Sequence, residues 1–172
     1  MGVRWVAVLM VLAGAGSSVW AAGGASPEGW RQFRFGMSPE AALAELGSAG
    51  EAHGDAIRTA VDIEGESYTV LMSFRAGRLH DVFLKSSIGR ARAGTDAQCL
   101  AFHRGVVGRL AESYGRDGET EHSAVGEGVR TLFTRTRLVF ADGRRVIAET
   151  KFVPSLGGNG LCDSSLSYLD AN

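Results

Sequence analysis

The chain has 172 residues, and its 18 basic and 19 acidic side chains give a formal net charge of −1. This balance excludes the excess of basic residues that attracts nucleic acid or anionic lipid. Only Lys85 and Lys151 are lysines, and the abundance of arginine, glycine and alanine is typical of a GC-rich bacterial genome.

The first 21 residues are typical of a secretory signal peptide. Arg4 supplies the positive charge, residues 6–15 form an apolar run, and Val19 and Ala21 occupy the −3 and −1 positions of a cleavage site. The apolar run is shorter than the roughly 20 residues of a membrane span. We therefore predict export to the periplasm of a Gram-negative bacterium and no membrane span after cleavage; a retained N-terminal anchor is the alternative.

The rest of the chain is one domain's length. Residues 22–29 are mostly small and polar, so we predict a flexible tail followed by a single α+β domain over 30–172. Aromatic residues near position 30 predict a short extended segment that packs on the core. Ser38 as N-cap, Pro39 at the first helical position and Gly47 as the stop predict a helix over 39–46.

From residue 56 onward, apolar and polar residues alternate with the period of β-strands. The alternation predicts three strands within residues 57–85. After a second helix, the charged and glycine-rich segment 116–128 predicts an exposed loop. Two further strands, 129–140 and 145–153, are joined at the hairpin signal Asp142-Gly143, and Cys162 opens a last strand.

The second helix is predicted over residues 95–115. Thr95 and Gln98 fit a capping box, and Gly115 fits a left-handed stop. At 100° per residue, one broad face of this helix requires a cover. Its members are Cys99, Leu100, Phe102, His103, Val106, Val107, Leu110 and Tyr114.

Together these elements predict two helices on an antiparallel sheet of about six strands. The segments 74–78 and 140–144 share a pattern, with Phe at the first position, Gly at the fourth and Arg at the fifth. Halves 30–87 and 95–172 would then be a tandem α-β-β-β duplication, which is a hypothesis.

Two cysteines in an exported chain are most simply a disulfide. Cys99 and Cys162 would close a loop of about 63 residues, which stabilises by roughly 4 kcal/mol in the chain-entropy model. The rival interpretation makes Cys99, His103 and Cys162 ligands of a metal ion.

The opposite side of the second helix carries Ala101, Gly105, Gly108 and Glu112. Two glycines on an exposed helix face cost about 1 kcal/mol each relative to alanine. Either GC-rich coding explains them, or a second helix or partner chain lies close. On the second interpretation these four residues form an interaction face.

Signatures of catalysis are missing from the sequence. It contains no GxSxG, P-loop or HExxH motif, and the glycine-rich stretches near 126 and 157 read as turns. His53 and His122 lie in predicted loops, and His80 lies on a strand face with Val82 and Leu84. His103 lies within the apolar face of the second helix, one turn from Cys99. A disulfide at Cys99 would remove a Cys–His nucleophile. We predict no catalytic residue, no metal and no cofactor.

The run Gly36-Met37-Ser38-Pro39-Glu40, followed by Leu46-Gly47, resembles the opening motif of small exported αβ modules. These include outer-membrane assembly lipoproteins of the SmpA/OmlA type and β-lactamase-inhibitor-like proteins. The resemblance implies a helix packed on a small antiparallel sheet, and a protein that binds other envelope components. This chain has no lipidation cysteine, and its second half lacks the Gly-Met pair.

Our leading hypothesis is therefore a non-enzymatic periplasmic module that binds another envelope protein. A carrier of a small apolar ligand between helix and sheet is the first alternative. An unrecognised hydrolase or metal enzyme is the second.

Overall fold

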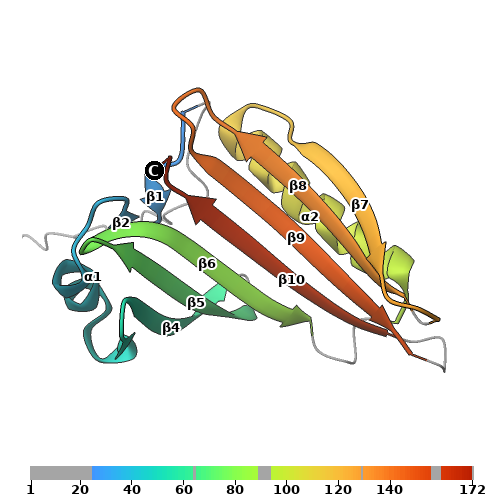
Figure 1. The fold of residues 1–172 in the computed structure, drawn as a ribbon, viewed down its shortest axis with the longest axis horizontal. Helices are drawn as coiled ribbons and strands as arrows, with labels where there is room; N and C mark the ends of the chain where they lie inside the picture. The colour runs from blue at the N-terminus through green and yellow to red at the C-terminus, as the bar shows by residue number, and fades with distance from the viewer. Residues whose placement is uncertain (1–24, 64, 89–93, 129, 156–159, 172) are drawn as a thin grey trace, which may run out of the picture.

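The computed structural model describes residues 25–171 except 64, 89–93, 129 and 156–159. The predicted signal peptide therefore lies outside the described residues. The described residues form two helices and two sheets, whose arrangement can be followed in Figure 1. The elements are β1 (Gly29–Trp30), β2 (Phe33–Arg34), α1 (Pro39–Leu46), a 3-10 turn (Gly47–Ala49), β3 (Glu51–His53), β4 (Ala56–Ile63), β5 (Glu66–Arg75), β6 (Arg78–Ile88), α2 (Asp96–Tyr114), β7 (Glu119–Val125), β8 (Thr131–Val139), β9 (Arg145–Pro154) and β10 (Gly160–Leu169).

The main sheet has eight strands in the order β3-β4-β5-β6-β10-β9-β8-β7, and every paired neighbour is antiparallel. The chain is thus an α+β protein, as predicted. The two halves of the chain meet where β6 pairs with β10, and Leu84 lies opposite Leu166 at this seam. Hairpin β1–β2 forms a separate two-stranded sheet.

Our count of about six strands was wrong because we missed both edges of the main sheet. β3 has three residues and β7 has seven, and every residue of both is exposed. We had assigned 116–128 to a loop. An edge strand with no buried face shows no alternation of apolar and polar residues, and charges on it are a common protection against edge-to-edge pairing.

The predicted α-β-β-β unit is not found, since each helix is followed by four strands. The two turns on which we based it also join different strands. Segment 74–78 connects the third and fourth strands after α1, whereas 140–144 connects the second and third strands after α2. Their similarity therefore does not mark equivalent positions in the two halves.

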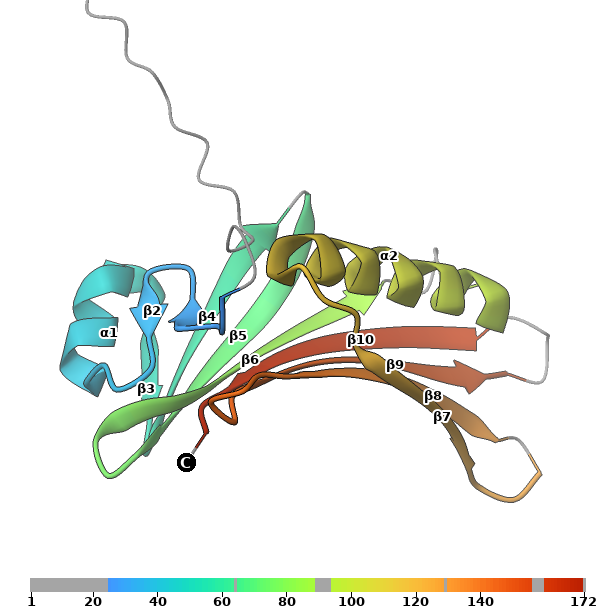
Figure 2. The ribbon, with the colours of Figure 1, turned by 90° about the horizontal axis from the view of Figure 1, so that it is seen from above.

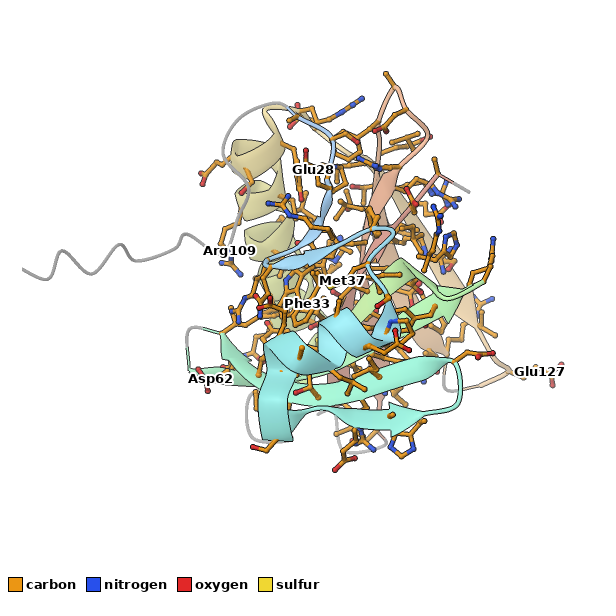
Figure 3. The ribbon with its side chains drawn as sticks, turned by 90° about the vertical axis from the view of Figure 1, so that its left-hand side faces the viewer. Glu28, Phe33, Met37, Asp62, Arg109 and Glu127 are labelled. Carbon is orange, nitrogen blue, oxygen red and sulfur yellow. A yellow bond between two sulfur atoms is a disulfide. The ribbon has the colours of Figure 1, made fainter. Side chains whose placement is uncertain are left out.

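The predicted helix ends are confirmed. In α1, Ser38 Oγ accepts a hydrogen bond from the backbone N–H of Ala41 at 3.2 Å. In α2, Thr95 and Gln98 form the reciprocal capping box, and Gly115 adopts a left-handed conformation with φ of 61°. Both helices lie on the same side of the main sheet (Figures 2 and 3).

The segment before residue 30 is more ordered than we predicted. We expected a flexible tail over 22–29; residues 22–24 lie outside the described part of the chain, but Pro27 is fully buried and Gly29 begins β1. A Cβ at Gly29 would lie 1.9 Å from the carbonyl oxygen of Phe33, so only glycine fits this hairpin. The hairpin presses Trp30 and Phe33, stacked at 6.1 Å, into the core.

Candidate binding surfaces

The disulfide predicted from the cysteine count is present. Cys99 in α2 is bonded to Cys162 in β10 across 63 residues of sequence. Both sulfur atoms lie in a small buried cluster with Phe152. The bond therefore fastens the start of α2 to the sheet, and it leaves no thiolate at either position for catalysis or metal binding.

His103 is a satisfied core histidine. It is 3% exposed, its Nδ1 lies 2.9 Å from Thr150 Oγ1, and its Nε2 lies 2.9 Å from Thr136 Oγ1. Burial lowers the pKa of His103, and repulsion by His122 lowers it further. The neutral ring donates one hydrogen bond and accepts the other. Its role is to hold α2 on β8 and β9.

The described ranges contain no candidate metal site. No three His, Cys, Asp or Glu side chains lie together there in a way that fits an ion. Likewise, neither described helix is long and apolar enough to cross a bilayer.

The four residues of the predicted interaction face, Ala101, Gly105, Gly108 and Glu112, are all exposed on α2. A Cβ at Gly108 would meet nothing within 4 Å, and one at Gly105 would meet only the end of Arg109 at 3.9 Å. No described residue of this chain therefore requires glycine at either position. Whether another molecule contacts this face stays a prediction.

The side of the main sheet away from the helices has no described element over it, and we call it the open face. In Figure 2 the sheet arches, with α1 and α2 above it and the open face on the hollow side. Along the six longer strands, open-face residues alternate with buried ones, as in the pattern of β10 from Gly160 to Leu169. The sequence indicates apolar residues on the open face as well as in the core, because these strands have apolar residues at both alternating sets of positions.

Apolar side chains cross the middle of the open face. Leu71 of β5 lies opposite Phe83 of β6, and beyond Ser167 of β10 lies Ile147 of β9. Leu71, Phe83 and Ile147 are only half-buried. The three most exposed large apolar residues that the structure describes are also on this face: Val125 (62%), Val139 (47%) and Leu161 (39%). Contiguous exposed apolar groups mark contact sites. Here Leu71 and Phe83 are adjacent, whereas Val125 and Val139 lie near opposite ends of the face.

Charged side chains of both signs surround these apolar groups. Arg135 in β8 donates to Glu149 in β9 at 2.8 Å and to Glu121 in β7 at 3.3 Å, so one guanidinium ties three strands together. Asp81 in β6 lies between Ser73 and Leu169 on its neighbouring strands, and burial raises its pKa to about 6. The open face thus combines an apolar middle, arginines and one carboxyl group that is partly desolvated.

Comparison of the chain with protein-family models, with curated proteins and with solved structures found no match.

Proposed function

We propose that this chain is an exported binding module that contacts another protein of the cell envelope through the open face. The observation that carries the proposal is an eight-stranded sheet with helices on one side only, whose other side holds the most exposed apolar side chains described. Large sheets normally bury apolar residues under a covering layer. A partner protein would supply the second layer here.

The composition of the open face fits a protein partner better than a lipid or nucleic acid. Protein interfaces are enriched in aromatic residues and arginine, with a polar rim around a more apolar middle. Phe83 and Ile147 would form that middle, and the network of Arg135 would lie at the rim. Because both signs of charge are present, the face has no excess of cations to attract phosphates.

Export is part of the proposal. It rests on the signal-like residues 1–21 and on the disulfide, since disulfides persist mainly in oxidising compartments. The resemblance to SmpA/OmlA and β-lactamase-inhibitor-like modules supports the same role, because those modules bind other proteins or envelope components. The helix face of Ala101, Gly105, Gly108 and Glu112 is the competing contact surface.

Site-specific photo-crosslinking in the periplasm of the native host tests which surface is used. A photoreactive phenylalanine would replace Phe83 or Val139 on the open face, and Glu112 on α2 as the matched control. We expect one discrete adduct of the same mass from both open-face positions and none from Glu112. Introduction of a charge at a third site, Ile147→Arg, should abolish that adduct without lowering the unfolding midpoint.

Two results would contradict the proposal. An adduct from Glu112 alone would move the contact to the glycine face of α2. Absence of any adduct from both open-face positions, in protein whose disulfide is intact by mass spectrometry, would remove the open face as a contact surface.

A further inference from the structure

A cavity of about 250 Å³ lies between α2 and the middle of the sheet, on the side opposite the open face. One flank of α2 forms a wall, and β5, β6, β9 and β10 form the floor. Figure 3 labels Arg109, which belongs to the α2 wall. The largest apolar side chains that line the cavity are Trp30, Ile63, Tyr68, Leu84, Phe102 and Leu166.

The volume limits the size of a ligand. A buried apolar cavity of about 150 Å³ is large enough for benzene. A cavity of about 250 Å³ therefore accommodates a two-ring molecule or a short branched chain, and it is too small for a lipid with long acyl chains. Gly105, which is exposed, belongs to the lining, so the cavity reaches the surface beside α2.

The charges around the cavity favour a neutral ligand. The charged residues of the lining are Glu66, Arg109 and Glu149, apart from the neutral His103. The side chain of Glu149 lies on the open face, where it is paired with Arg135, so its charge does not face the cavity. The remaining charges are one of each sign, so the lining has no excess charge to balance an ionised ligand.

We propose that this cavity is a binding site for a small, neutral, largely apolar molecule of about two rings. This site is separate from the open face and goes beyond the protein-binding role, because the two surfaces lie on opposite sides of the sheet. The proposal also explains why residue 105 is glycine, because the absence of a side chain there leaves the entrance to the cavity open.

Two glycines of the same helix provide a matched pair of variants. Gly105→Leu places a side chain at the entrance, whereas Gly108→Leu adds the same side chain at an exposed position that does not line the cavity. Both substitutions replace glycine by a good helix former, so both should fold at least as well as the parent chain. Unfolding midpoints in urea check this directly.

The probes are 2-naphthol, a two-ring alcohol, and naphthalene, which has the same rings without the hydroxyl. Binding of 2-naphthol to the disulfide-intact chain is followed by its fluorescence, and naphthalene is measured by competition. We expect saturable binding of one equivalent. Gly105→Leu should weaken it about tenfold or more, and Gly108→Leu should change it by less than about twofold. Naphthalene should displace 2-naphthol from the same site, because the lining contacts the apolar rings.

The proposal fails if neither probe binds saturably to the parent chain, or if the two leucine variants weaken binding equally. Because purified protein and small probes are used, none of these results depends on whether a protein partner binds the open face.

Discussion

Replacing Asp81 by asparagine should stabilise the protein at neutral pH and not at acid pH. Burial raises the pKa of this carboxyl group from 3.8 to about 6. One of its oxygens, Oδ1, is buried without a hydrogen-bond partner among the described residues. Neither Ser73 nor Leu169, its neighbours across the strands, offers a positive charge. The folded chain therefore holds the proton more tightly than the unfolded chain does.

The sign of the effect follows from linkage. Between about pH 4 and pH 6 the unfolded chain loses this proton and the folded chain keeps it, so the free energy of unfolding falls as the pH rises through this window. A shift of two units corresponds to about 3 kcal/mol. Asp81 is only partly buried, and screening by solvent reduces the expected penalty to about 1 to 1.5 kcal/mol. An asparagine side chain has the same shape as this aspartate and cannot ionise.

Urea unfolding at pH 4 and pH 7.5 measures the difference. Asp81→Asn should raise the free energy of unfolding by about 1 to 1.5 kcal/mol at pH 7.5 and by much less at pH 4. Asp117→Asn, at an exposed position before β7, controls for the removal of one negative charge. The reasoning is refuted if Asp81→Asn has the same effect at both pH values, or if it destabilises the protein at pH 7.5.

Three other predictions concern stability. Replacing Cys99 and Cys162 together by alanine should lower the free energy of unfolding by about 4 kcal/mol, since their bond closes a loop of 63 residues; a change below about 1 kcal/mol in urea unfolding would contradict this. Gly118→Ala should cost about 1 to 3 kcal/mol, because its Cβ would lie 2.5 Å from the methyl group of Thr136. Gly108→Ala in α2 should instead raise the free energy of unfolding by about 1 kcal/mol. Equal effects of the two alanine substitutions on thermal unfolding would contradict both predictions.

Local sequence signals predicted the helices well because their causes are local. A capping box needs only residues three apart, and a left-handed stop needs only a glycine, so the ends of α2 were readable from Thr95, Gln98 and Gly115. The six longer strands were also readable, since each buries one face. The disulfide followed from counting cysteines in a chain predicted to be exported.

The features missed are those set by distant residues. β7 has no buried face, so nothing in Glu119–Val125 alternates in polarity, and only its pairing with β8 makes it a strand. The cavity is lined by residues from seven elements, and no short stretch of sequence carries its shape. His103 was recognisable as a buried residue, but its two threonine partners lie 33 and 47 residues away.

The cavity follows from the unequal lengths of the two helices. α1 has 8 residues and extends over about 12 Å, whereas α2 has 19 and extends over about 28 Å. The strands β5 and β6, with 10 and 11 residues, are about 35 Å long. α1 therefore covers only one end of its own half of the sheet, and it contacts β4. The rest is covered by hairpin β1–β2 and by the flank of α2, and the cavity is the space that these two leave. Equal halves, which the duplication hypothesis implies, would have placed a second long helix over this part of the sheet.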